Sequence, residues 1–98
     1  MPIKEGSRAA PSLVLLSTSD CQLCDEAQRA LMAMPQVAGW LLSVRDIATD
    51  DALIERYGER IPVLQLEAGD GQCLGELDWP FDDAALAGLF KRCLGAAG

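Results

Sequence analysis

The stretch of sequence that decides the fold is residues 13–24, LVLLSTSDCQLC. Its first four residues form an apolar run with the length of a short buried strand, and residues 17–20 are small and polar, as in a tight loop. Beyond Cys21, apolar residues recur at intervals of three and four, which is the spacing of one helix face. The sequence therefore predicts a strand, a loop and a helix over residues 13–34, with both cysteines of the C-x-x-C in the first helical turn.

Two cysteines at such a helix start are typical of a dithiol that cycles between thiol and disulfide. Unpaired backbone N–H groups and the positive end of the helix dipole stabilise a thiolate there. Disulfide exchange needs one accessible thiolate to attack and a second thiol within reach to resolve the mixed disulfide. Because Cys21 lies at the helix end and Cys24 lies one turn inside, we predict that Cys21 attacks and Cys24 resolves. The alternative is that both are ordinary buried cysteines that pack as small apolar side chains.

Composition narrows the class of protein. The chain has 98 residues, half of them apolar, which predicts one folded domain. Its net charge of -7 argues against nucleic acid and anionic membrane surfaces as partners, and no apolar run reaches the roughly 20 residues that span a bilayer. We expect a monomer. Residues 1–8 lack the apolar centre of a signal peptide, so we expect a cytoplasmic protein, where paired cysteines are usually redox-active or metal-binding.

The absence of histidine narrows the chemistry further. It excludes catalysis by a Cys–His pair, zinc sites of the Cys₂His₂ type and any histidine general base. Acidic pairs such as Asp50-Asp51 and Asp82-Asp83 lie at predicted helix starts, where carboxylates cap the helix and complement its dipole. The remaining chemistry is therefore that of the thiols.

The rest of the chain alternates between strand and helix patterns. Residues 1–11 are predicted to be a flexible arm, and residues 12–95 the folded domain. The predicted elements after the first helix are a strand at 40–47, a short helix at 49–57, a hairpin of strands at 62–67 and 72–77 whose turn at 68–71 places two glycines at positive φ, and a final helix from Asp82 or Asp83 to about Cys93.

The resulting order, βαβαββα with a C-x-x-C after the first strand, resembles the thioredoxin fold. The resemblance covers residues 12–95 and is carried by the CQLC motif at 21–24, the RIPV motif at 60–63 and the strand–strand–helix ending. Together with the segments DIATD at 46–50 and DWPF at 78–81, the chain resembles a small bacterial glutaredoxin-like family. This resemblance implies an α/β fold, a four-stranded mixed sheet flanked by helices.

The resemblance also implies an activity and further site residues. It implies a thiol–disulfide oxidoreductase that acts on a disulfide-bearing protein or a glutathionylated substrate and is regenerated by a thiol reductant. It implies a cis bond between Ile61 and Pro62, with the proline beside the dithiol and with Ile61 and Val63 bordering the substrate. No tightly bound cofactor and no metal are expected. Glutathione carries net negative charge, as this chain does, and Gln22 and Leu23 stand where dithiol glutaredoxins usually have Pro and Tyr; both points argue against glutathione as the reductant.

Two further cysteines and an aromatic cluster have simpler interpretations. Cys73 and Cys93 lack a C-x-x-C partner, and their places on a strand and on a late helix face favour core positions. A regulatory disulfide, or a metal site built together with Cys21 and Cys24, is the alternative. The segment Trp79-Pro80-Phe81 precedes the last helix and is interpreted as a hydrophobic staple that also borders the site.

Two other functions remain open at this point. A soft-metal carrier for copper or zinc also places a C-x-x-C at the start of its first helix, but copper chaperones have the order βαββαβ and usually a Met where Ser19 stands. A non-catalytic redox sensor or binding module would use the disulfide only to change its affinity for a partner. Metal titration separates the first from an oxidoreductase, and turnover of a disulfide separates the second.

Overall fold

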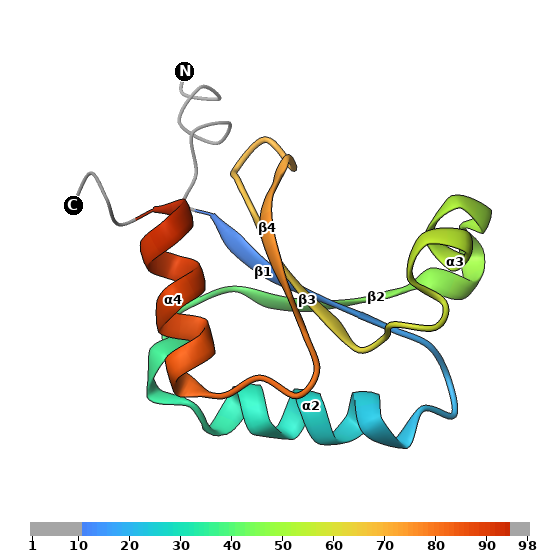
Figure 1. The fold of residues 1–98 in the computed structure, drawn as a ribbon, viewed down its shortest axis with the longest axis horizontal. Helices are drawn as coiled ribbons and strands as arrows, with labels where there is room; N and C mark the ends of the chain where they lie inside the picture. The colour runs from blue at the N-terminus through green and yellow to red at the C-terminus, as the bar shows by residue number, and fades with distance from the viewer. Residues whose placement is uncertain (1–10, 95–98) are drawn as a thin grey trace.

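A computed structural model describes residues 11–94, so the predicted arm lies outside the described residues apart from Pro11. Strands and helices follow in the predicted order βαβαββα (Figure 1). None of the described helices is long and apolar enough to cross a membrane. The elements are β1 (Ser12–Ser17), α2 (Gln22–Ala33), β2 (Leu42–Asp46), α3 (Asp51–Tyr57), β3 (Val63–Glu67), β4 (Cys73–Asp78) and α4 (Asp83–Cys93).

Within residues 11–94 the sheet has four strands in the order β2-β1-β3-β4. β1 runs parallel to β2 and antiparallel to β3, and β3 is antiparallel to β4, which confirms the predicted mixed sheet. Leu16 of β1 lies opposite Val63 of β3. The loop from β1 to the C-x-x-C helix and the loop that enters β3 therefore lie at the same end of the sheet.

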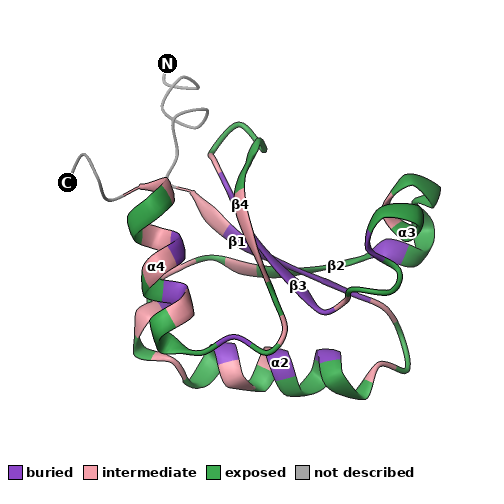
Figure 2. Ribbon diagram, viewed as in Figure 1, coloured by how far each residue is buried: buried purple, intermediate pink, exposed green. Residues whose placement is uncertain are grey.

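Alternate residues of β1 divide the core between the two faces of the sheet. Leu13 and Leu15 pack with the buried side chains of α2 and α4, whereas Val14 and Leu16 pack with Tyr57 at the end of α3. α2 and α4 thus cover one face and α3 covers the other, and the two central strands are buried on both sides (Figure 2). This placement explains why β1 and β3 read as nearly continuous apolar runs.

The second strand differs from its predicted range of 40–47. It begins at Leu42, because the chain is still turning at Trp40, whose indole stacks on Phe90 with ring centroids 4.7 Å apart. It ends at Asp46, whose carboxylate accepts a hydrogen bond of 2.8 Å from the Ala48 N–H and starts a 3₁₀ turn at Ile47. A local side-chain cap therefore overrides the apolar pattern that favoured a longer strand.

The hairpin turn and the last helix test two more local predictions. Of the two turn glycines, Gly71 has a positive φ of 92° and Gly69 does not, so the prediction for Gly69 was wrong. The Asp70 carboxylate accepts a hydrogen bond of 3.0 Å from the Gln72 N–H and so helps to form this turn. Asp82 caps α4 by accepting from the Ala85 N–H at 2.8 Å, as predicted.

Candidate dithiol active site

The loop between β1 and α2 sets the direction of the first cysteine. Asp20 has a φ of 58°, in the left-handed region that aspartate adopts more readily than most residues. The next residue, Cys21, returns to an extended conformation and forms the N-cap of α2. The reversal at Asp20 therefore places the Cys21 side chain at the helix end.

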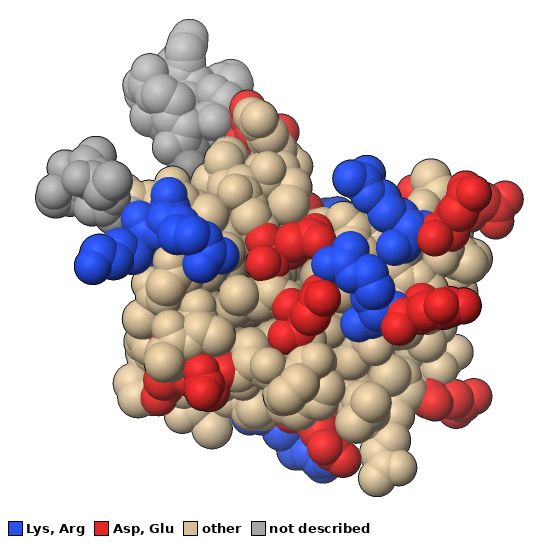
Figure 3. Space-filling model, in the orientation of Figure 1, with Lys and Arg blue, Asp and Glu red and all other residues tan. Residues whose placement is uncertain are grey.

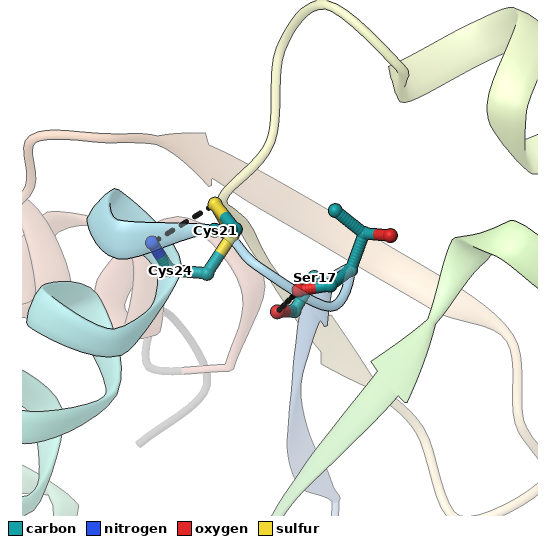
Figure 4. Close-up of a disulfide and its surroundings, with 4 residues drawn as sticks. Ser17, Cys21 and Cys24 are labelled. Atoms are coloured by element: carbon teal, nitrogen blue, oxygen red, sulfur yellow. Dashed lines mark hydrogen bonds between the residues drawn. A yellow bond between two sulfur atoms is a disulfide. The ribbon is translucent and has the colours of Figure 1, made fainter.

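Cys21 and Cys24 form a disulfide, with their Cα atoms 5.2 Å apart. The backbone N–H of Cys24 donates to the Cys21 Sγ at 3.1 Å, so the sulfur occupies the place that a serine or aspartate oxygen usually takes at an N-cap (Figure 4). Cys21 is half-buried, whereas Cys24 is 2% exposed. The structure thus brings the two predicted cysteines together, one accessible and one enclosed.

The loop that enters β3 lies at the same end of the sheet. Its Ile61–Pro62 bond is cis, as predicted, and Pro62 is fully buried. The Pro62 carbonyl oxygen accepts a hydrogen bond of 3.3 Å from the Trp79 N–H, which ties the loop to the aromatic segment after β4. Contact between the Pro62 ring and the two sulfurs stays a prediction.

The residues on either side of Pro62 have partners within the fold. The Ile61 N–H donates to the Tyr57 carbonyl oxygen at 3.0 Å, so a substrate strand there would have to use the Ile61 carbonyl instead. Val63 is fully buried and lies between Leu16 and Asp78 in the sheet. The side chain of Val63 therefore packs in the core, and its contact with substrate stays a prediction.

Of the two remaining cysteines, Cys73 begins β4 and Cys93 ends α4. Cys93 is partly buried, with its thiol 3.3 Å from the Leu74 carbonyl oxygen. Cys73 is exposed, so the predicted core position was wrong: it is the first residue of an edge strand, beside an irregular register with β3. Partial burial raises the pKa of the Cys73 thiol and nearby Glu76 adds to the rise, although hydrogen bonding with the Gly75 backbone opposes it.

These surroundings predict a difference in thiol reactivity. In the reduced protein at pH 7, Cys21 should react with iodoacetamide at least about tenfold faster than Cys73, because the thiolate is the nucleophile and only Cys21 lies at a helix start. The Cys73 rate should keep rising with pH into the alkaline range, since its pKa lies above that of an ordinary cysteine. Mass spectrometry of the alkylated peptides measures both rates, and equal rates near neutral pH would contradict the assignment of Cys21.

The acidic residues beside the dithiol predict a second effect on reactivity. Asp20 and Asp25 flank the pair, and like charge disfavours the Cys21 thiolate. Asp20→Asn keeps a residue that tolerates positive φ and removes one charge, so alkylation of Cys21 at pH 6 should accelerate by about twofold. Asp83→Asn, a charge change at the start of another helix, is the matched control and should leave the rate unchanged. An equal acceleration in both variants would assign the effect to net charge alone.

A metal site has less support from the geometry. Within residues 11–94, no group of three or more His, Cys, Asp or Glu side chains is placed to hold a metal ion. The observed order βαβαββα also differs from the βαββαβ order of copper chaperones.

One charged residue beside the site was missed by the sequence interpretation. Arg60 entered it only as the first letter of the RIPV motif, yet its side chain makes two ion pairs with β4. The one feature of the sequence that could have indicated a role for Arg60 is its position two residues before Pro62.

Comparison with solved structures finds one protein that is more than 30% identical to this chain and others that are less than 25% identical. A structural-genomics target protein from X. campestris is 37% identical; the match covers 83% of this chain and 97% of that chain, with a TM-score of 0.62. A protein from Nitrosomonas europaea solved by NMR is 22% identical over 82% of this chain and 91% of that chain, with a TM-score of 0.65. A mutant thioredoxin from Halobacterium salinarum is 24% identical over 89% of this chain and 77% of that chain, with a TM-score of 0.63. The last two show the fold alone.

Sequence comparison identifies the family. A search of curated proteins finds no match. The model of the glutaredoxin-like domain (DUF836) matches residues 12–91, a range that runs from β1 almost to the end of α4 and contains the dithiol, the cis-proline loop and the capped last helix. With that match and the thioredoxin-like arrangement of its sheet, the chain belongs to the glutaredoxin-like domain family.

Proposed function

We propose that this protein is a thiol–disulfide oxidoreductase in which Cys21 attacks and Cys24 resolves. The observation that carries the proposal is the 3.1 Å hydrogen bond from the Cys24 N–H to the Cys21 Sγ at the start of α2. The same N–H would favour the thiolate once the disulfide is reduced, because hydrogen bonding to the charged form stabilises it. The family match and the fold support a redox role for the pair.

The proposed reaction transfers two electrons from the dithiol to a substrate disulfide. The Cys21 thiolate attacks one substrate sulfur, forming a mixed disulfide and releasing the other substrate sulfur as a thiolate, which takes a proton from water. The Cys24 thiol then loses its proton to solvent and attacks the Cys21 Sγ, which releases the second substrate thiolate. The product is the Cys21–Cys24 disulfide, and a thiol reductant returns two electrons and two protons to it.

Charge and backbone geometry guide the choice of partners. We propose a disulfide-bearing protein or a glutathionylated protein as substrate, paired through the carbonyl of Ile61 and backed by Pro62. The two flanking aspartates and the net charge of -7 disfavour the anionic glutathione as electron donor, so a dithiol reductant is the proposed one. No tightly bound cofactor enters this reaction.

Turnover of bis(2-hydroxyethyl) disulfide with dithiothreitol as reductant tests the proposal, together with the reduction potential of the dithiol. We expect multiple turnovers and a potential on the reducing side of the thioredoxin-fold range, because differences of about 100 mV separate reductants from oxidants. A Cys21–Cys24 disulfide that can be formed and reduced, but that gives no turnover of the substrate disulfide, would instead indicate a sensor. Tight binding of copper(I) or zinc without turnover would indicate a metal carrier.

A further inference from the structure

Arg60 sits at the centre of a charged cluster that the dithiol chemistry does not use. Its Nη2 lies 2.6 Å from Glu76 Oε1 and 2.7 Å from Asp78 Oδ1, and its guanidinium lies over the Tyr57 ring, 5.1 Å from the ring centroid. Figure 3 shows acidic and basic side chains in contact on the surface between β4 and α3. The Arg60 side chain is 40% exposed, so the cluster lies at the surface.

One of the two carboxylates that hold Arg60, that of Glu76, is itself fixed by hydrogen bonds. Glu76 Oε2 accepts a hydrogen bond of 3.0 Å from the Tyr57 hydroxyl, and the buried Gln65 amide donates to the same hydroxyl at 3.1 Å. Burial acts to raise the pKa of Glu76, but the hydrogen bonds from Arg60, Tyr57 and Gln65 outweigh it and hold that pKa below its usual value. Glu76 therefore stays ionised at neutral pH and offers Arg60 a rigid partner.

The backbone around Arg60 leads directly to the proposed site. The N–H groups of Arg60 and Ile61 both donate to the Tyr57 carbonyl oxygen, at 2.8 and 3.0 Å. Two residues later the Pro62 carbonyl accepts from Trp79, the residue that follows Asp78. The side chain of Arg60 and the carbonyl of Pro62 thus fasten the same short loop to the same end of β4.

A second arginine, Arg45, makes a simpler ion pair and serves as a comparison for Arg60. Arg45 makes one ion pair of 3.1 Å, with Glu67, and touches neither the loop nor the aromatic ring. Its partner Glu67 is only 11% exposed, so this pair is less exposed than the two pairs of Arg60, but it joins only β2 to β3. Arg60 instead joins α3, the loop and β4, which is an arrangement suited to fixing a position.

We propose that Arg60 is a positioning residue, which holds the Ile61–Pro62 loop against β4 so that an extended substrate lies in line for attack by Cys21. This inference rests on the proposed function but names a separate residue and a separate step. The inference predicts that Arg60 affects the reduction of substrates that pair with the loop. It also predicts that Arg60 does not affect the reactivity of the Cys21 sulfur. Small disulfides that need no pairing should be reduced equally well without it.

The test compares two substrates across matched variants. For Arg60→Ala, kcat/KM with a disulfide-linked peptide should fall by about tenfold, since misplacement of a reacting group by about 1 Å has effects of this order or larger. Reduction of bis(2-hydroxyethyl) disulfide and alkylation of Cys21 should stay within about twofold of wild type. Asp78→Asn should act in the same direction as Arg60→Ala, with non-additive effects in the double variant, and Arg60→Lys should restore part of the peptide activity. Arg45→Ala is the control and should match wild type with both substrates.

Amide hydrogen exchange followed by NMR tests the same inference without activity. In Arg60→Ala the N–H groups of Ile61 and Trp79 should exchange faster than in wild type, while those at the centre of β1 should not change. Unchanged exchange at Ile61 and Trp79, or a parallel loss with both substrates, would overturn the positioning role. If wild type reduces neither substrate, the proposed oxidoreductase function fails, and the exchange rates alone decide whether Arg60 holds the loop.

Discussion

Replacing Cys21 by serine should reduce disulfide exchange by at least about a hundredfold, because a serine hydroxyl is not ionised at neutral pH and cannot replace the attacking thiolate. Replacing Cys24 by serine has a different expected result: attack still occurs, but the mixed disulfide on Cys21 is no longer resolved and accumulates. Turnover assays and mass spectrometry under non-reducing conditions measure both outcomes. Cys24 is 2% exposed and accessible Cys21 caps the helix, so the two variants should not be equivalent.

The exposed thiol provides the matched control for these variants. Cys73→Ser removes a cysteine that is more accessible to solvent than Cys24, and it should leave turnover unchanged. If the Cys21 and Cys24 variants lose activity equally and neither accumulates a mixed disulfide, the attack-and-resolve roles are wrong.

Gly75→Ala should lower the free energy of unfolding by about 1–3 kcal/mol, the usual effect of adding a methyl group to a filled space. A Cβ at this position in β4 would lie 2.7 Å from the Cys93 Sγ and 3.0 Å from the Leu89 Cδ1 on α4. Because Leu89 is fully buried, the strand and the helix would have to separate slightly. Urea denaturation monitored by tryptophan fluorescence measures the change.

A second substitution makes this prediction specific. Cys93→Ala in the Gly75→Ala background removes the nearer of the two atoms and should recover much of the lost stability, so the two effects should not add. Gly88→Ala on α4 is the control of opposite sign: its Cβ would meet only the Arg92 side chain at 3.7 Å, and alanine favours a helix over glycine by about 1 kcal/mol. An additive double variant would show that the contact with Cys93 is not the cause.

Local patterns predicted most of the fold. The run at 13–16 and the helical spacing after Cys21 are strong signals because burial and periodicity agree there. Asp82 was one of two predicted caps of the last helix, and its hydrogen bond reaches only three residues along the chain. The cis bond before Pro62 needed the family resemblance, since an isolated X–Pro bond is usually trans.

The features that the sequence did not predict depend on pairing between segments that are distant along the chain. Arg60 meets carboxylates 16 and 18 residues further along the chain, and these pairs exist only once β3 and β4 are in register. The exposure of Cys73 likewise follows from an edge position and an irregular register, neither of which a strand pattern contains. The hydrogen bond from the Ile61 N–H to the Tyr57 carbonyl also forms only in the turn after α3 and was not predicted.

The unequal covering of the two sheet faces has a consequence for motion. α3, all seven residues of which the structure describes, has Tyr57 as its one buried residue, and isolated helices shorter than about 12 residues are marginal in water. Such an element is expected to unfold locally at lower free energy than the β1–α2 unit, whose side chains enter the main core. The carbonyl of Tyr57 accepts from the N–H groups of Arg60 and Ile61, so each local opening of α3 would release the loop that enters β3 while the two sulfurs stay fixed on α2. The two cysteines are therefore carried by a more stable element than the one that anchors the loop entering β3.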